Sequence, residues 1–201
     1  MPAGFDYPTS PHSRRHGPEG YADYRSYHPW LRDEYTFRCV YCLKREQWGL
    51  RRGTFDLDHF EPASVDPGKR EVYDNLVYSC HACNLDKSNQ RCPDPECVLT
   101  AEQVIVHDDG AIEGLTEEAD RLIQMLDLDD DDYRNWREMM IRILQLARER
   151  DPGLYLQLMG YPDDLPDLSR RRRRPPNNTR PEGIEESSLA KRERGELPET
   201  Y

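Results

Sequence analysis

The spacing of hydrophobic and polar positions divides the chain into parts of different character. Residues 21–90 hold most of the aromatic and cysteine content and are predicted to form the compact unit. Within this unit, apolar and acidic positions alternate over residues 55–59. A period of two predicts a half-buried strand that ends at the Asp58-His59 pair. The polar stretch from Asn84 to about Gln90 predicts the start of a short helix.

Residues 101–160 show two other patterns. The apolar triplet at residues 104–106, the Asp109-Gly110 turn and Ile112 predict a small hairpin. Thr116 is the expected N-cap of a helix, because acidic residues fill the following turn. Apolar residues at three- and four-residue spacing then predict a second helix, with Tyr133, Trp136, Met140, Ile143, Leu144 and Ala147 on one face.

The two ends of the chain lack any periodicity. Residues 1–20 are rich in Pro, Gly, His and Arg, which predicts a flexible arm. The segment beyond Gly160 is rich in proline and contains five consecutive arginines at residues 170–174, which predicts disorder over residues 161–201. The expected organisation is therefore an arm (1–20), a compact domain (21–100), an acidic hairpin and helical extension (101–160) and a disordered tail (161–201).

Composition and charge limit the function classes. The chain is 36% hydrophobic and 33% charged, which is too polar for all 201 residues to pack around one core. The net charge of −11 argues against a protein that coats nucleic acid nonspecifically. The balance is nevertheless +4 over residues 12–52, so a nucleic-acid enzyme with local basic residues remains open.

The apolar runs are short. The longest spans five residues, Cys39 to Leu43, whereas a membrane-spanning helix needs about 20. The first thirty residues contain no apolar stretch typical of a secretory signal. We therefore expect a cytoplasmic protein without a membrane partner, in a reducing compartment where cysteines bind metal more often than they form disulfides.

Four of the six cysteines form two pairs of the Cys-x2-Cys type, Cys39 with Cys42 and Cys80 with Cys83. Two residues between thiolates let both sulfurs of a knuckle face one tetrahedral zinc ion, and two knuckles complete four ligands. The pattern predicts one structural Zn²⁺. The alternative is a set of buried or redox-active cysteines.

Two further groups are open to a metal interpretation. Cys92 and Cys97 are either free thiols on a loop or part of a second zinc site with His81 or His107. The aspartates at residues 129–132 are either a solvated helix start or a calcium loop. The glycine and the ligand spacing of an EF-hand are missing, which favours the helix start.

The insertion between the knuckles carries candidate chemistry. Asp58 offers a hard carboxylate oxygen and Asn84 an amide oxygen, both suited to Mg²⁺ or Mn²⁺. His59 is a base that is partly neutral at pH 7. An imidazole beside a divalent cation is the minimum equipment for hydrolysing a phosphodiester. Lys87 is the candidate for an additional phosphate contact.

The order of these elements resembles the HNH endonuclease family, in the subset with a Cys-x2-Cys pair on each side. The resemblance covers residues 39–88 and implies an α+β fold, a ββα-metal core with a structural zinc. By this resemblance Asp58 and Asn84 are the metal ligands and His59 is the general base. Asn75 would position the loop that carries His59.

The resemblance implies an enzyme that hydrolyses DNA with Mg²⁺ or Mn²⁺ and leaves 5′-phosphate and 3′-hydroxyl ends. RNA as the substrate remains open. The alternative is a noncatalytic zinc module that binds nucleic acid or protein. Such a module needs the cysteines but none of Asp58, His59 and Asn84. Residues 101–160 are a candidate docking region for a protein partner, and similar nucleases act as subunits in bacterial defence against phage.

Overall fold

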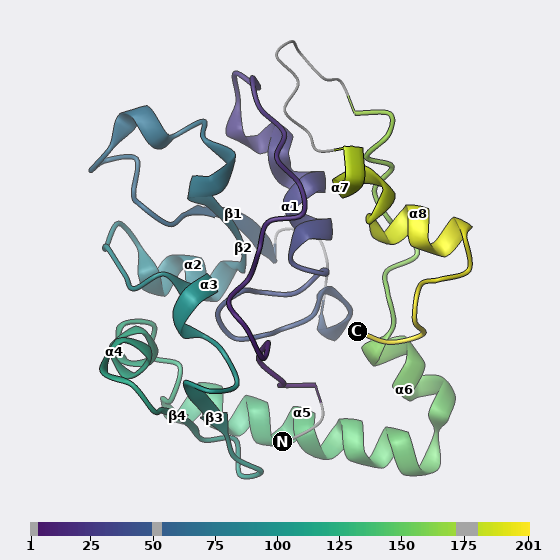
Figure 1. Cartoon of the computed structure of the whole chain (residues 1–201). Helices are drawn as coiled ribbons and strands as arrows, with labels where there is room; N and C mark the ends of the chain where they lie inside the picture. The colour runs from purple at the N-terminus through teal and green to yellow at the C-terminus, as the bar shows by residue number, and fades with distance from the viewer. Residues whose placement is uncertain (1–3, 50–53, 172–180) are drawn as a thin grey trace.

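The computed structural model describes residues 4–49, 54–171 and 181–201. Small helices surround two separate two-stranded antiparallel sheets (Figure 1). The α-helices are α1 (His28–Glu34), α2 (His81–Lys87), α3 (Pro95–Val98), α4 (Glu117–Met125), α5 (Asp131–Arg150), α6 (Pro152–Met159), α7 (Pro181–Glu185) and α8 (Ser188–Glu193). The strands are β1 (Phe55–His59), β2 (Leu76–Cys80), β3 (Val104–Val106) and β4 (Ile112–Gly114). The 3₁₀ turns are η1 (Tyr24–Tyr27), η2 (Glu46–Trp48), η3 (Pro67–Lys69) and η4 (Tyr73–Asn75).

The predicted strand–strand–helix core is present. Strands β1 and β2 pair antiparallel, with Asp58 opposite Val77 and His59 opposite Leu76. Helix α2 starts directly after β2 and packs against both strands. β2 is buried along its whole length and also packs against α1, whereas β1 buries Phe55 and Asp58 and leaves its other three positions half-buried. The α+β class and the strand at residues 55–59 are therefore confirmed.

The predicted elements of residues 101–160 are also present. β3 and β4 form the hairpin, and the Thr116 side chain caps α4 by accepting a hydrogen bond from the Ala119 amide. α5 contains the second predicted helical face and buries Met140, Ile141 and Leu144. The following helix α6 has a proline at its start and packs against α5 as an additional element.

The described part of the N-terminal segment is folded, which corrects the prediction of a flexible arm over residues 1–20. Phe5 and Tyr7 are buried, and the Tyr7 hydroxyl donates a hydrogen bond to the Tyr41 carbonyl at 2.6 Å. The Phe5 ring also lies against Trp48 and Trp136, with ring centroids 5.2 and 5.6 Å away. Isolated anchors of this kind carry no periodic signal, so the sequence pattern does not reveal them.

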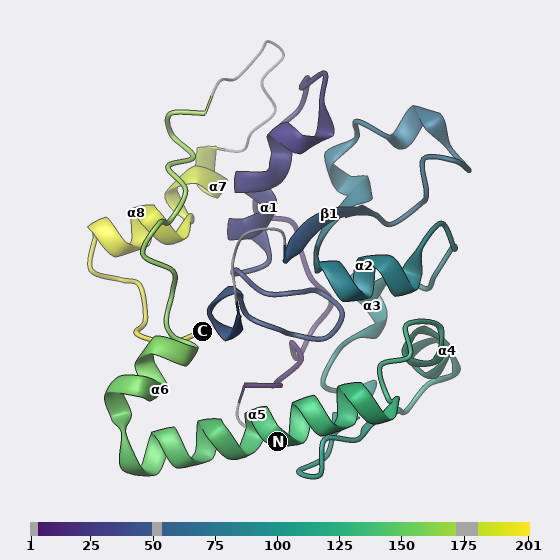
Figure 2. The same ribbon diagram turned by 180° about the vertical axis from the view of Figure 1, so that it is seen from behind.

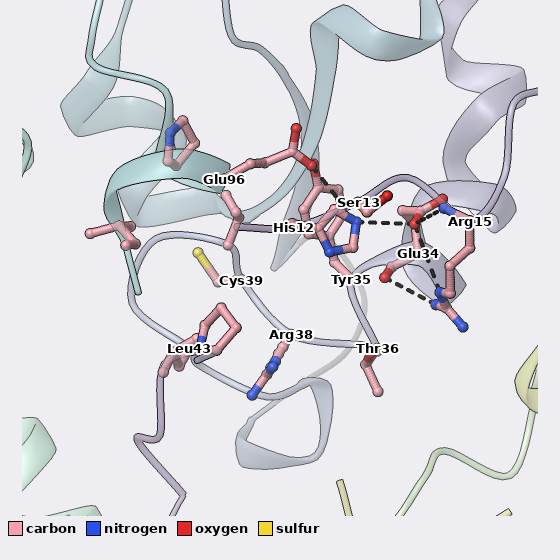
Figure 3. A pocket seen from close by; sticks show the side chains of 14 residues that line it. His12, Ser13, Arg15, Glu34, Tyr35, Thr36, Arg38, Cys39, Leu43 and Glu96 are labelled. Carbon is pink, nitrogen blue, oxygen red and sulfur yellow. Dashed lines mark hydrogen bonds and ion pairs between the residues drawn. The ribbon is translucent and has the colours of Figure 1, made fainter. Parts of the chain in front are cut away.

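Two buried carboxylates on α1 hold the middle of this N-terminal segment. Glu34 accepts hydrogen bonds from the His12 ring and from the Arg15 and His16 amides, at 3.0, 2.8 and 2.8 Å (Figure 3). Asp33 lies 2.8 Å from His16 Nε2. Although burial alone would raise it, these donors lower the pKa of Glu34 to about 2.

The C-terminal segment is also folded where the structure describes it, which corrects the prediction of disorder over residues 161–201. The Ser188 amide at the start of α8 donates to the buried Asp33 carboxylate at 2.8 Å. The Tyr201 ring lies 4.0 Å from the guanidinium of Arg45, and its hydroxyl donates to Gln47. Figure 2 shows α7 and α8 beside α1, with the C-terminus returning towards α6. Of the arginine run, residues 172–174 lie outside the described residues.

Candidate functional site

The four paired cysteines form one buried cluster. Their Sγ atoms all lie within 4.8 Å of one another, and Cys42 and Cys80 are 3.7 Å apart. A tetrahedral zinc with bonds of about 2.3 Å to sulfur requires sulfurs about 3.8 Å apart. The first knuckle lies in the turn after α1, and the second joins the end of β2 to α2.

The surroundings of the cluster suit a structural zinc. Contacts with the thiols of Cys39, Cys42 and Cys83 lower the pKa of Cys80, so a thiolate forms readily there. The Tyr133 hydroxyl lies 3.4 Å from Cys83 Sγ and 3.2 Å from an Asp86 oxygen, so α5 touches the cluster directly. Four buried sulfurs match the ligand set of a structural site.

Neither of the other two metal interpretations is supported by the described residues. Among residues 4–49, 54–171 and 181–201, the one grouping of His, Cys, Asp and Glu donors that can hold a metal ion is the cysteine cluster. Burial raises the pKa of Cys92 to about 11, which favours a neutral thiol. Asp130 caps α5 by accepting from the Tyr133 amide, and Asp129 accepts from the Ile112 amide.

His59 is the last residue of β1, and one of its ring nitrogens forms a hydrogen bond. Its Nε2 lies 3.0 Å from the carbonyl oxygen of Arg70, in the loop between β1 and β2. A carbonyl oxygen only accepts, so Nε2 carries the proton and Nδ1 is left with a lone pair. The ring also meets the edge of Tyr24, with centroids 4.7 Å apart and planes at 62°. The imidazole is thereby oriented with one basic nitrogen available.

Asn75 connects the two ends of the loop between β1 and β2. Its side-chain oxygen accepts from the Glu61 amide at 2.8 Å, and its Nδ2 donates to the carbonyls of Glu61 and Lys69 at 3.0 and 3.2 Å. Its own carbonyl accepts from the Phe60 amide. The buried amide side chain thus fixes the residues that follow His59, and these contacts support its predicted positioning role.

Asp58 is buried, at 4% exposure, beneath α2. The Tyr41 hydroxyl donates to its Oδ2 at 2.6 Å, and the Lys87 ammonium donates to its Oδ1 at 3.1 Å. Lys87 also donates to the His59 carbonyl at 2.8 Å and is fully buried. Burial outweighs these partners and raises the pKa of Asp58. The predicted phosphate contact of Lys87 needs correction, because its ammonium faces the interior.

Asn84, predicted to share a metal ion with Asp58, forms its side-chain hydrogen bond with Asp56. Its Nδ2 donates to Asp56 Oδ2 at 3.1 Å, and His81 Nδ1 donates to the same oxygen at 2.7 Å. Asp56 precedes Asp58 by two positions on β1, so both carboxylates lie on one face of the strand. The structure therefore places Asn84 beside Asp56, and Asp58 beside Lys87. The alternation in β1 already indicated that the two aspartates share a face, but not which one meets Asn84.

In the candidate site formed by Asp58, His59 and Asn84, the carboxylate and amide oxygens are of the type that suits a hard divalent cation. With Nδ2 turned to Asp56, the free end of Asn84 is its oxygen. A carboxylate has about four lone-pair positions, so Asp58 keeps acceptor capacity after two hydrogen bonds. Oxygen donors of this type are those that Mg²⁺ and Mn²⁺ prefer. The cavity of ≈ 270 Å³ in Figure 3, between the N-terminal segment and the first knuckle, includes none of these side chains.

The match to known families agrees with this arrangement. Residues 39–90 match the HNH endonuclease family model. This segment is an HNH domain. It contains both knuckles, the strands β1 and β2, and α2. No curated protein matches the chain. Among the described residues, no helix is long and apolar enough to cross a membrane.

Proposed function

We propose that the protein is a metal-dependent endonuclease that hydrolyses phosphodiester bonds in DNA. The observation that supports this most directly is His59, whose ring is oriented by the Arg70 carbonyl at the end of β1. An imidazole with a free Nδ1 can accept the proton of a water molecule as that water attacks phosphorus. The HNH domain makes the nuclease class the expected one, and the choice of DNA is the proposal.

Asp58 and Asn84 are the proposed ligands of a catalytic Mg²⁺ or Mn²⁺ ion. Asp56 holds the amide of Asn84 so that its oxygen is the free end. Tyr41 and Lys87 fix the Asp58 carboxylate. A bound divalent ion would neutralise the charge of the scissile phosphate and of the departing 3′ oxygen. The chain's own part is to hold the ligands and to keep His59 in its basic tautomer.

The zinc cluster has a separate, structural part in this proposal. It joins the first knuckle to the end of β2 and the start of α2, so it sets the distance between the strand that carries His59 and the helix that carries Asn84. Four sulfur ligands leave no open position for substrate. Catalysis should therefore depend on an added hard cation while the zinc stays in place.

The test is cleavage of supercoiled plasmid DNA by zinc-loaded protein over a range of Mg²⁺ and Mn²⁺ concentrations. We expect nicked or linear products with added metal and none after chelation of the weakly bound ion, with zinc content unchanged. Asn84→Ala should shift the metal dependence to higher concentration, and direct titration of Mn²⁺ by electron paramagnetic resonance should show the same weakening. A noncatalytic zinc module would bind DNA equally well and leave the plasmid intact at every metal concentration.

A further inference from the structure

Because Lys87 is buried, the candidate site formed by Asp58, His59 and Asn84 lacks the phosphate contact that was expected from this lysine. A nuclease needs cations near the base that attacks, because phosphate contacts supply much of the affinity for nucleic acid and fix its position. Two arginines are linked to His59 through its direct neighbours: Arg25 contacts the Tyr24 ring that packs on His59, and the Arg70 carbonyl contacts the His59 ring. One precedes α1, outside the HNH match, and the other lies in the loop between β1 and β2.

Tyr24 connects the first of these arginines to the imidazole. Its ring meets the His59 ring edge-on at 4.7 Å, and the Arg25 guanidinium lies 5.3 Å from the centre of the Tyr24 ring. η1 holds both residues in place, because the Asp23 side chain caps it by accepting from the Arg25 amide at 3.0 Å. The Arg25 side chain thus contacts the Tyr24 ring, which in turn contacts the His59 ring.

Arg70 is connected to the imidazole through its own backbone. Its backbone carbonyl accepts a hydrogen bond from His59 Nε2 at 3.0 Å. The backbone of Arg70 is therefore in direct contact with the imidazole. η1 and the loop between β1 and β2 project from the same end of the molecule in both views (Figures 1 and 2). Residues from two separate segments, Tyr24 next to Arg25 and Arg70 itself, therefore contact one imidazole.

The acidic neighbours hold these two arginines only weakly. Arg25 is 74% exposed and its contact with Asp23 is 4.0 Å long. Arg70 is 60% exposed and its contact with Glu71 is 3.6 Å long. Exposed pairs of this kind contribute little stabilisation, so a phosphate can replace the carboxylate at little cost. Of the other acidic residues in this loop, Glu61 is already paired with Lys69 and Arg91, and Asp66 lies 4.0 Å from Lys69.

We propose that Arg25 and Arg70 bind DNA phosphates next to the scissile one, with Tyr24 as the flat surface between Arg25 and His59. We call Tyr24, Arg25 and Arg70 the phosphate surface. Its assignment rests on the proposed function of the candidate site formed by Asp58, His59 and Asn84. The fitting partner is the backbone of a DNA duplex, which presents regularly spaced charges to two fixed guanidinium groups. The N-terminal element is thereby part of the substrate site and completes what the HNH segment lacks.

The experiment measures binding separately from cleavage. The parent protein carries His59→Ala, and its affinity for a fluorescent 20-base-pair DNA duplex is measured by anisotropy at several salt concentrations. Arg25→Gln and Arg70→Gln are introduced singly and together. Arg142→Gln is the matched control, because Arg142 is 73% exposed on α5 and pairs weakly with Glu138 at 3.7 Å.

We expect each substitution to reduce the slope of log affinity against log salt by about 0.9, and the double variant by about 1.8. At 0.1 M salt this corresponds to a loss of about eightfold in affinity per arginine. Arg142→Gln should match the parent. A double variant with the slope of the Arg142→Gln control would overturn the proposal, as would a parent that does not bind the duplex. If native protein binds with the expected slopes but cuts no DNA at any metal concentration, the surface stands and the nuclease proposal fails.

Discussion

The cysteine cluster and the candidate site formed by Asp58, His59 and Asn84 share helix α2 but are built in opposite ways. The cluster brings four identical buried donors within 4.8 Å of one another. In the candidate site each side chain has its own hydrogen-bond partners. Asp58 is held by Tyr41 and Lys87, and Asn84 is held by Asp56. His59 is half-buried and keeps one nitrogen available. The cluster is buried, whereas the His59 ring is partly exposed.

The difference follows from what each site has to do. A structural site contributes its binding free energy to folding, so its donors converge and exclude water. A catalytic site must keep open positions for water and substrate, and its groups are held by neighbours that fix their orientation. Changes in the cluster should therefore unfold the domain. Substitutions of Asp58, His59 or Asn84 should slow the reaction or alter its metal requirement.

The largest expected effect is that of Cys80→Ser. Structural zinc supplies roughly 10 kcal/mol or more to small folds, and Cys80 joins β2 to α2. We expect loss of zinc and of cooperative unfolding in the HNH domain, measured by elemental analysis and circular dichroism. Cys97→Ser is the control, because Cys97 is exposed and outside the cluster. A folded, metal-free Cys80→Ser protein would show that the cluster is not a structural site.

His59→Ala should act on the reaction alone. Loss of a general base costs about 10² to 10⁴ in rate, and the half-buried ring is not part of the zinc cluster. The measurement is single-turnover cleavage of plasmid DNA, with zinc content and thermal unfolding recorded on the same samples. His107→Ala on the exposed hairpin serves as the control. Cleavage by His59→Ala at the native rate would remove His59 from the mechanism.

The same comparison explains what the sequence predicts well. Cysteine spacing, strand alternation and a capped helix are local patterns, so the zinc ligands, β1 and α4 follow from them. The partners of Asp58 and Asn84 belong to contacts between segments distant in the sequence, and no spacing rule distinguishes Asp56 from Asp58 as the neighbour of Asn84. Tyr24 and Tyr133 are missed for the same reason, since each reaches its site from outside residues 39–90.

The ends of the chain show a second limit of sequence patterns. Residues 4–20 and 181–201 are polar and nonperiodic, yet they are fastened by single buried side chains and by the two carboxylates of α1. Composition predicts disorder when too little apolar surface can be buried. Here the segments bury little surface of their own and use hydrogen bonds to a preformed helix, which composition does not reveal.

Lys87→Met tests whether the buried Lys87–Asp58 pair of the candidate site stabilises the fold. The substitution leaves the Asp58 carboxylate buried without its cation, which typically costs about 3–5 kcal/mol. We expect the midpoint of urea unfolding to fall while zinc remains bound. Adding Asp58→Asn should recover part of the loss, because the buried charge is removed. Lys69→Met, which breaks an exposed pair with Glu61, should change the midpoint of urea unfolding only slightly. A Lys87→Met protein as stable as the Lys69→Met control would show that the buried pair has no structural part.

Tyr133→Phe is the smallest change and tests how far the zinc site extends beyond the HNH match. The hydroxyl donates to an Asp86 oxygen at 3.2 Å and lies 3.4 Å from Cys83 Sγ, so its removal takes one polar partner away from a cysteine of the cluster. Loss of a partner that orients a metal ligand typically costs about 10- to 100-fold in metal affinity, and we expect the lower end because the other sulfurs are unchanged. The stability of the loaded protein should fall by only about 1 kcal/mol. The measurement is the transfer of zinc to a coloured chelator, with Tyr155→Phe on α6 as the control that removes the same atom elsewhere. Equal zinc transfer from the two variants would mean that α5 only packs beside the cluster. Faster transfer from Tyr133→Phe would make the acidic extension part of the metal site.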